Sequence, residues 1–527
     1  MVLKGSCVMI GADRELELKV ELTHHGLANI DGGGRLAELA VGPAQTQNVR
    51  SIYFDTPDQR LRAKGLSLRV RRVGRRWIQT VKADTDVHGG LSNPIEVEGE
   101  VHGGEPELES VSDRAIRKEI RKALDGSALM PVFETVVRRT TRHLRVGGNS
   151  EIELALDEGV VKSPAGACEI REAELELKSG SADALLTVAE ALFAREPIRL
   201  AEKSKAERGY DLLLGRPASA PKPLTASLPE IVAKRSCAEA FREILSAVAE
   251  QVLHNWQVVM ETDDPEGPHQ LRVGLRRLRS ALRVFRPVAD SARLRELDTE
   301  ARELGRVVGE LRDVDVLLDG VVAPAMASDH GLLGFTKLRE ILASDRTTRR
   351  DQVKAALLSP RWSCFQLRLA LLSKLADDWT DTGDDGVAVA RPVRKLARKA
   401  LKGCWRKVAR RAERLDELTV EERHQMRKAL KALRYAVEFF LPIYSAKASR
   451  RFLRDLKDLQ DIFGYLNDVA MAKKLMDLAP MHAFDAELQR ATGYVLGWHA
   501  ARSTEAWASV RKRWRKVESA PRFWAGR

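Results

Sequence analysis

Charged residues alternate strictly with apolar residues in several short segments of the N-terminal half of this 527-residue chain. In Glu15-Leu-Glu-Leu-Lys19 the three charged residues would share one face of a β-strand, because successive side chains of a strand point to opposite faces. The same alternation places Glu174, Glu176 and Lys178 on one face of another segment. Clustered carboxylates of this kind are oxygen donors suited to Mg²⁺ or Mn²⁺.

Other segments of the same half carry charges of one sign. Arg69 and Arg71 share a face in one segment, Lys82 ends the next, and Glu96 and Glu98 follow in a third. If such strands closed into a barrel with the charged faces inside, the acids could hold metal and the bases could hold phosphate oxygens. The alternative is that each charged face is the solvated side of an open antiparallel sheet.

These segments resemble the CYTH family, the triphosphate tunnel metalloenzymes. The family's ExExK strand is matched by Glu15–Lys19, and the ordered matches span nearly all of residues 10–212. The further matches are Tyr53-Phe-Asp-Thr-Pro57, Leu68-Arg-Val-Arg71, Thr80-Val-Lys82, Glu96/Glu98, Phe133-Glu-Thr-Val-Val-Arg-Arg139, Glu174-Leu-Glu-Leu-Lys178 and Lys203-Ser-Lys205-Ala-Glu-Arg-Gly-Tyr210. The resemblance implies an eight-stranded antiparallel β-tunnel with flanking helices, which binds a triphosphate and cleaves it with the help of metal.

The resemblance also implies roles for individual side chains. The catalytic residues would be Glu15, Glu17, Lys19 and Glu98, the last of which would orient the attacking water. The metal ligands would be Glu15, Glu17, Glu174, Glu176 and Asp157. The phosphate-binding residues would be Lys19, Arg69, Arg71, Lys82, Arg139 and Lys203. One departure from the family pattern is Ser92-Asn-Pro-Ile-Glu96, where a basic or aromatic residue is expected near the acidic pair.

The C-terminal half contains a duplicated basic segment. The first copy has cations in steps of three and four, the spacing of one helical face: His269, Arg272, Arg276, Arg279 and Arg283. An offset of 155 residues leads to the second copy: His424, Arg427, Lys431 and Arg434. The same offset maps Gly309–Val314 onto Gly464–Val469. A constant offset over two separate motifs predicts two pseudo-symmetric helical bundles.

Four basic residues on one helical face repel one another, and an anion between two such helices would relieve that repulsion. The alternatives are a solvated face, or pairing with acids such as Asp313 and Asp468. The repeated motifs resemble the CHAD family, the conserved histidine α-helical domains, over roughly residues 231–510. The resemblance implies binding of long-chain inorganic polyphosphate by a basic cleft. The candidate residues are His269, Arg272, Arg276, Arg279, Arg283, His424, Arg427, Lys428, Lys431 and Arg434.

The distribution of charge and a proline-rich segment indicate how the chain is divided into domains. Residues 1–214 carry 31 Lys and Arg against 34 Asp and Glu, whereas the remainder carries 57 against 41. A proline-rich linker at 215–230 separates the two parts. We therefore expect an α+β multidomain protein with a β-tunnel domain at 8–214 and an all-α domain at 231–515. The internal repeats of the all-α domain would span about 236–375 and 391–511.

Composition excludes several classes of protein. No apolar run reaches the length of a membrane-spanning helix, and five scattered cysteines argue against a disulfide framework or a zinc site. A cytoplasmic protein is therefore expected. The polyphosphate binding implied by the resemblance would associate it with polyphosphate granules. Only 5% of residues are aromatic and no nucleic-acid motif is present, which disfavours nucleic acid as the partner.

The sequence thus predicts a metal-dependent hydrolase of inorganic triphosphate, or of short polyphosphate, joined to a polyphosphate-binding domain. Two alternatives remain open at this point. One is a non-catalytic polyphosphate-binding protein. The other is a triphosphatase acting on an organic triphosphate such as thiamine triphosphate or a nucleotide.

Overall fold

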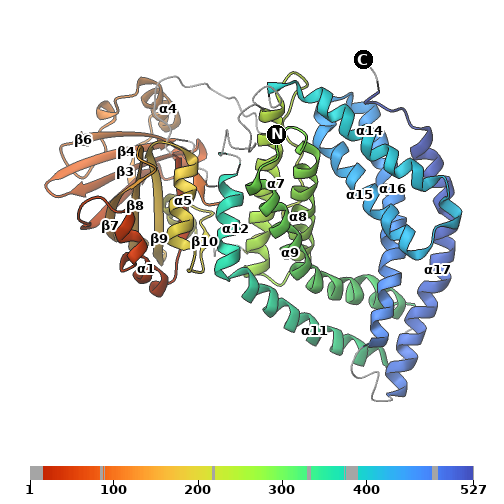
Figure 1. Cartoon of the computed structure of the whole chain (residues 1–527). Helices are drawn as coiled ribbons and strands as arrows, with labels where there is room; N and C mark the ends of the chain where they lie inside the picture. Colours follow the sequence, from red (N-terminus) through yellow and green to blue (C-terminus); the bar gives the residue numbers. More distant parts are fainter. Residues whose placement is uncertain are drawn as a thin grey trace. The chain divides into compact units, whose positions relative to one another are not determined.

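The computed structural model describes residues 16–83, 87, 89–215, 220–328, 334–372, 374, 390–477 and 485–525. It divides into two compact units (Figure 1). Unit 1 comprises residues 1–220 and 358–375, and unit 2 comprises residues 221–357 and 376–527. The expected domains are continuous in sequence, so the segment 358–375 is the one place where the units depart from that expectation. No helix among the described residues is long and apolar enough to cross a membrane.

Unit 1 is built on one antiparallel sheet. Its strands are β1 (Leu16–Glu21), β2 (Gln45–Asp55), β3 (Leu66–Val73), β4 (Arg76–Ala83), β5 (Leu91–Ser92), β6 (Ile95–Val101), β7 (Met130–Val146), β8 (Ser150–Ser163), β9 (Gly166–Ser179) and β10 (Arg199–Leu200). The order across the sheet is β10-β1-β9-β8-β7-β2-β3-β4-β6, with β5 also paired to β1. The short segment from β5 to β6 therefore runs from one end of the sheet to the other and curls it into a tunnel-like half-barrel. The eight strands other than β5 and β10 are at least six residues long, so the expected fold is confirmed.

Helices cover the outside of this sheet (Figure 1). They are α1 (His24–Asp31), α2 (Gly34–Leu39), α3 (Arg60–Ala63), α4 (Arg114–Leu124) and α5 (Ala182–Phe193), with α12 (Pro360–Leu371) packed on α5. The helix α6 (Lys205–Leu213) instead packs on the cavity-facing side of the strands. The apolar face of α4, with Ile116 and Ile120, joins a core formed with Leu68 and Val81 of the strands. Because this apolar core lies outside β3 and β4, the charged faces of these strands are left to line the interior.

Two local features fix the start of α6. Ser204 caps the helix by accepting from the backbone N–H of Glu207, and the Glu207 side chain in turn accepts from the Ser204 backbone. A Cβ atom at Gly209 would lie 2.2 Å from the ring of Phe133, so only glycine lets α6 approach β7 this closely. Lys205, the first residue of α6, is thereby held at the sheet.

Unit 2 consists of two sets of helices. The first set is α7 (Cys237–Glu261), α8 (Glu266–Phe285), α9 (Ala292–Asp315), the π-helix η2 (Val316–Val322), α10 (Ala323–Met326) and α11 (Gly334–Leu357). The second set is α14 (Val393–Ala412), α15 (Val420–Phe440), α16 (Ala446–Met471) and α17 (Ala486–Ser519). The offset of 155 carries α7, α8, α9 and α11 onto α14, α15, α16 and α17 to within a few residues, so the repeat has a direct structural counterpart.

Candidate active site and anion-binding cluster

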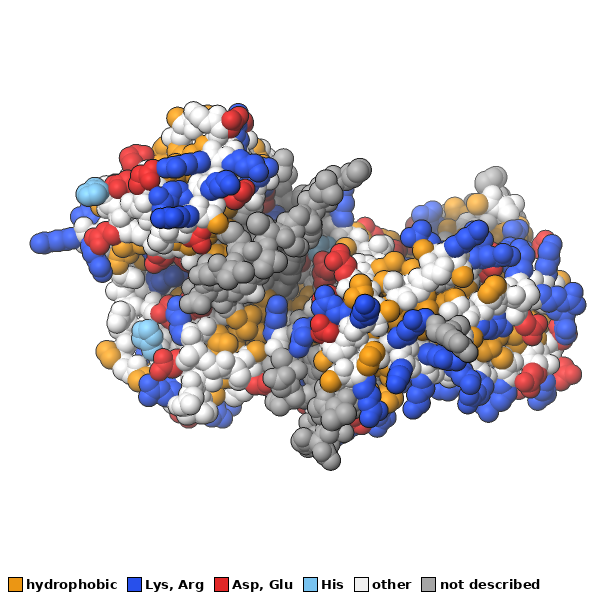
Figure 2. Space-filling view, turned by 90° about the horizontal axis from the view of Figure 1, so that it is seen from above, with side chains coloured by type: hydrophobic (Ala, Val, Ile, Leu, Met, Phe, Trp, Pro, Cys, Tyr) orange, Lys and Arg blue, Asp and Glu red, His pale blue; other side chains and the backbone are white. Residues whose placement is uncertain are grey.

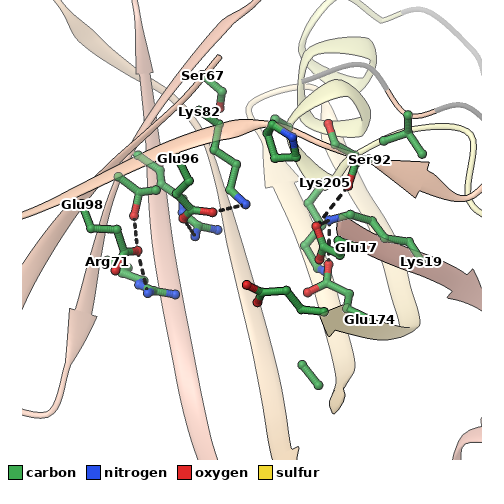
Figure 3. Close-up of a pocket in the computed structure, with 18 of the residues that line it drawn as sticks. Glu17, Lys19, Ser67, Arg71, Lys82, Ser92, Glu96, Glu98, Glu174 and Lys205 are labelled. Carbon is green, nitrogen blue, oxygen red and sulfur yellow. Dashed lines mark hydrogen bonds and ion pairs between the residues drawn. The ribbon is translucent and has the colours of Figure 1, made fainter. Parts of the chain in front are cut away.

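The interior of the unit 1 half-barrel holds a cavity of about 290 Å³ (Figure 3). Side chains from β1, β3, β4, β6, β7, β8, β9 and α6 line it. The charged members of the lining are Glu17, Lys19, Arg69, Arg71, Lys82, Glu96, Glu98, Arg139, Glu153, Glu174, Glu176, Lys178 and Lys205. One cavity thus collects cations and carboxylates that are far apart in the sequence.

Basic residues dominate one wall of the cavity. Arg71 Nη2 donates to Glu98 Oε1 at 2.9 Å, and Lys82 forms an ion pair with Glu96, its partner across the β4–β6 ladder. Burial and the neighbouring Arg69 lower the pKa of Arg71. A cation that is crowded by other cations is stabilised by an added anion, so this wall is suited to phosphate oxygens.

Carboxylates form a row on the opposite wall. The strand register places Glu17 of β1 beside Glu176 of β9, and Glu176 beside Glu153 of β8. Ser92 of β5 donates its hydroxyl to Glu17 at 3.1 Å. The row offers the hard oxygen donors that Mg²⁺ or Mn²⁺ prefers. Among the described residues, however, no three acidic, histidine or cysteine side chains converge closely enough to enclose an ion.

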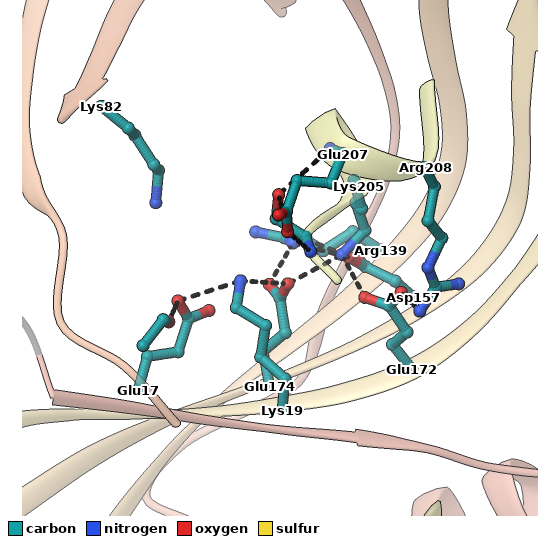
Figure 4. A network of polar contacts seen from close by, with 12 residues as sticks. Glu17, Lys19, Lys82, Arg139, Asp157, Glu172, Glu174, Lys205, Glu207 and Arg208 are labelled. Carbon is teal, nitrogen blue, oxygen red and sulfur yellow. Dashed lines mark hydrogen bonds and ion pairs between the residues drawn. The ribbon is translucent and has the colours of Figure 1, made fainter. Parts of the chain in front are cut away.

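Glu174 lies at the centre of a buried ion network at the base of the cavity (Figure 4). It accepts from Lys19 at 3.1 Å, from Lys205 at 2.7 Å and from Arg139 at 2.7 Å. Burial alone would raise the pKa of Glu174, but these three cations hold it well below its ordinary value. Burial would likewise lower the pKa of Lys19, and Glu17 and Glu174 instead raise it. Glu174 and Lys19 are therefore both charged at neutral pH.

Two of the expected site residues lie outside the cavity lining. Asp157 is fully buried and receives two hydrogen bonds from Arg139, at 2.7 and 2.6 Å, so it anchors a phosphate-binding candidate instead of facing a metal ion. Lys203 pairs with Asp211 at 2.8 Å, and Lys205 occupies the cavity in its place. Glu15, an expected metal ligand, lies outside the described residues.

Sequence reasoning missed Lys205, Glu153 and Ser92 as lining residues. The signals for two of them were present in the sequence. Lys205 stands two residues after Lys203 in the same motif, and Glu153 alternates with apolar neighbours in the segment that contains Asp157. No sequence signal points to Ser92, because its role depends on the pairing of β5 with β1.

In unit 2 the two basic segments meet where α8 packs against α15. The Lys431 ammonium is close to Arg276, Arg427 and Arg272, and burial together with these cations lowers the pKa of Lys431 to about 6. Burial and Arg272 lower the pKa of Arg276 to about 10. Among the described residues, no carboxylate lies within ion-pair distance of Arg276, Arg427 or Lys431. We call Arg272, Arg276, Arg427 and Lys431 the central cluster.

The remaining candidates have other partners or positions. Arg279 pairs with Asp298 at 2.9 Å and Arg434 with Glu438 at 2.9 Å, while Arg283 and Lys428 are exposed. In the central cluster, Arg272 pairs with Asp313 at 3.1 Å. Pairing with an acid of the repeat was one alternative for the basic face. In the central cluster this pairing neutralises Arg272 alone.

The two histidines occupy equivalent places with different neighbours. His424 Nδ1 lies 3.0 Å from Asn467 Oδ1, whereas the residue equivalent to Asn467 in the first repeat is Arg312. Burial and Arg312 lower the pKa of His269 to about 4, so His269 is neutral at pH 7.

A half-barrel with a charged interior, joined to a duplicated helical unit, defines a two-part class of protein. Residues 13–210 match the CYTH domain family and residues 243–477 match the CHAD domain family. The chain therefore belongs to the proteins in which a CYTH domain is fused to a CHAD domain.

Individual relatives are similar over parts of the chain. An inorganic triphosphatase of Haemophilus influenzae is 30% identical over 203 residues, which are 38% of this chain and 55% of that protein, so the chain spans about half the length of this curated relative. An uncharacterised protein of Mycobacterium tuberculosis is 25% identical over 476 residues, 84% of each chain. The crystal structure of the CHAD domain from Ricinus communis is 30% identical and covers 57% of this chain and 99% of its own, with a TM-score of 0.49.

Proposed function

We propose that unit 1 is a metal-dependent hydrolase that converts inorganic triphosphate to diphosphate and phosphate. The observation that carries this proposal is the convergence within one cavity of the cations Arg69, Arg71 and Lys82 and the Glu17–Glu176–Glu153 row of carboxylates. A cavity of about 290 Å³ suits a small, highly charged compound. The similarity to an inorganic triphosphatase favours inorganic triphosphate over thiamine triphosphate or a nucleotide.

The side chains would act mainly by positioning and by neutralising charge, as is general for phosphoryl transfer. Arg69, Arg71 and Lys82 exchange their carboxylate partners for phosphate oxygens, while Arg139 and Lys19 are held in place by the Glu174 network. Water attacks the terminal phosphorus, and the bond to the bridging oxygen breaks to release diphosphate. Glu98 accepts hydrogen bonds from Arg71 and Thr80, and we assign it to orienting that water.

The carboxylates Glu15, Glu17, Glu174 and Glu176 are proposed to hold Mg²⁺ or Mn²⁺, with Glu153 completing the row. A bound divalent ion would supply further neutralisation of the phosphate charge. The proposal requires the ion to compete with Lys19 for Glu17 and Glu174.

Phosphate release from four substrates tests this function: inorganic triphosphate, ATP, thiamine triphosphate and long-chain polyphosphate, each with Mg²⁺ or Mn²⁺. Fastest turnover of inorganic triphosphate supports the proposal. Fastest turnover of an organic triphosphate would replace the substrate, and no release from any of them would leave a non-catalytic polyphosphate-binding protein.

For unit 2 we propose binding of inorganic polyphosphate at the central cluster. Lys431 is partly buried among Arg272, Arg276 and Arg427, and in this cluster only Arg272 pairs with a carboxylate among the described residues. This arrangement favours an anionic ligand over a solvated face. Such binding would bring the hydrolase to polyphosphate granules in the cytoplasm. The test is the affinity of the full chain for polyphosphate with and without Arg276→Gln and Lys431→Gln, and equal affinities would reject the assignment.

A further inference from the structure

The helix α14 carries nine Lys and Arg residues and no acid in its 20 residues. By contrast, α9 mixes five Arg residues with seven Asp and Glu residues in 24. The cations of α14 are Arg394, Lys395, Arg398, Lys399, Lys402, Arg406, Lys407, Arg410 and Arg411. All except Arg411 are exposed, and Figure 2, which views the molecule from above relative to Figure 1, shows Lys and Arg side chains gathered over the part where α14 lies.

This arrangement works against the stability of the helix. Like charges stand four residues apart at Lys395/Lys399, at Lys402/Arg406 and at Lys407/Arg411. Two of the nine cations, Arg394 and Lys395, lie in the first turn of α14, where the helix dipole favours acids. Among the described residues, no carboxylate lies within ion-pair distance of Lys399, Lys402, Arg406 or Lys407. A surface helix that faces only solvent ordinarily carries both acidic and basic side chains. A helix with basic side chains alone would be stabilised by an anion that binds to it.

The basic face of α14 continues from the central cluster. The row on α8 runs from Arg272 through Arg279 to Arg283 at the last turn. The helix α14 packs along α15, which carries Arg427 and Lys431 of the central cluster. Burial raises the pKa of the Cys404 thiol of α14, and Lys407 and Arg283 act to lower it, as expected if Arg283 lies near α14. Arg283 therefore joins the α8 row to the cations of α14.

The chemistry of this face suits a simple chain of phosphates. Trp405 is the one aromatic residue of α14, and its ring is covered: it stacks on Trp514 at 5.5 Å and on the Arg522 guanidinium at 3.6 Å. No aromatic surface is left on α14 for stacking nucleic-acid bases.

We propose that a long inorganic polyphosphate chain extends from the central cluster past Arg283 and along the exposed face of α14. This second site, about 30 Å long from the length of the helix, makes the affinity of unit 2 dependent on chain length. The inference rests on the proposed binding of polyphosphate at the central cluster.

The test uses the full chain with EDTA, which prevents metal-dependent turnover, and two polyphosphates. One is shorter than α14 and the other is several times longer. The variant is Lys399→Gln/Lys402→Gln/Arg406→Gln, and the control is Arg302→Gln/Arg306→Gln/Arg339→Gln, which removes the same charge from exposed positions of α9 and α11. The variant should fold normally, because it removes repulsion and glutamine is a good helix former.

We expect the α14 variant to lose about tenfold or more in affinity for the long chain and about two units of salt dependence on a log–log scale. Its affinity for the short chain, and both affinities of the control, should remain unchanged. An unchanged long-chain affinity would overturn the inference and leave the central cluster intact, whereas a wild type that binds neither chain would overturn the proposed function itself. A larger loss for duplex DNA than for polyphosphate would reassign the face to nucleic acid.

Discussion

Lys19 and Glu174 face each other across the β1–β9 ladder, and Lys19 Nζ lies 3.1 Å from Glu174 Oε1. The same Nζ lies 3.0 Å from Glu17 Oε2 on its own strand. Lys19 thus lies between two carboxylates and offsets the repulsion between them in a buried site. The pair links the phosphate-binding side of the cavity to its proposed metal-binding side.

Replacing this lysine should damage both sides. In Lys19→Ala we expect triphosphate hydrolysis to fall by about 100-fold or more, the usual scale for losing one preorganised charge contact to a transition state. Unfolding should also become easier by about 1–3 kcal/mol, because Glu174 keeps Lys205 and Arg139 but loses one buried partner. Steady-state kinetics and urea denaturation measure the two effects. Lys64→Ala, an exposed position, is the control, and equal activity in both variants would contradict the role of Lys19.

The carboxylate row should determine the requirement for metal. EDTA should abolish triphosphate hydrolysis, and Mg²⁺ or Mn²⁺ should restore it. Glu176→Gln should raise the metal concentration that gives half-maximal activity by about tenfold, since it removes one charged oxygen ligand while keeping the shape of the side chain. Glu169→Gln lies on the same strand at an exposed position and should leave the metal titration unchanged. A metal-independent wild type would refute the metal assignment.

Alternating charges predicted strands with one charged face and one apolar face, but they left open whether the charged faces line a tunnel or face solvent. The resemblance to the CYTH family supplied the tunnel. The constant offset of 155 residues predicted the paired helices, which the structure shows as α8 with α15 and α9 with α16. Position within the site was harder to predict. Lys203 and Lys205 are equally basic and lie in one motif, and only the capping of α6 by Ser204 decides which of them faces the cavity.

That distinction gives a matched pair of variants. Lys205 forms ion pairs with Glu174 at 2.7 Å and with Asp157 and Glu172 at 2.8 Å, whereas Lys203 contacts Asp211 outside the lining. We expect Lys205→Gln to lower kcat/KM for triphosphate by about 100-fold and Lys203→Gln by less than about threefold. The reverse order, measured in the same assay, would show that the chain binds phosphate through the residue first expected from the motif.

The central cluster should make unit 2 sensitive to pH. The pKa of Lys431 falls to about 6 in the folded protein from about 10.4 in an unfolded chain. Between these two pH values Lys431 is protonated in the unfolded chain and neutral in the folded protein. The free energy of unfolding of unit 2 is therefore greatest at high pH and decreases as the pH falls toward 6. Urea denaturation should show a decrease of about 1–3 kcal/mol from pH 9 to pH 7 that Lys431→Met removes.

A bound polyanion should raise the pKa of Lys431 again, because it favours the charged form of this side chain. Binding of polyphosphate at pH 7.5 should therefore take up close to one proton. Calorimetry in two buffers with different ionisation enthalpies measures the uptake. The control Lys447→Met replaces an exposed lysine of α16 and should keep the wild-type uptake, whereas Lys431→Met should lose most of it. Equal uptake by all three proteins would refute the coupling.

The last prediction concerns α12, which lies between the two repeats in sequence but packs with the half-barrel in unit 1. Its Phe365 and Leu369 are fully buried, Arg368 pairs with Glu190 of α5 at 2.5 Å, and α5 in turn contacts β9. Because β9 carries Glu174 and Glu176, the proposed active site depends on a helix that a fragment ending at the linker would lack. Phe365→Ala should lower the free energy of unfolding of unit 1 by about 3–5 kcal/mol.

The matched control for that variant is Leu358→Ala, since Leu358 is 47% exposed just before α12. It should change stability by less than about 0.5 kcal/mol. Intrinsic fluorescence during urea denaturation and triphosphate hydrolysis after mild heating measure the two variants side by side. If Phe365→Ala unfolded at the same urea concentration as Leu358→Ala, α12 would be dispensable, and the half-barrel would be a self-sufficient domain ending at the proline-rich linker.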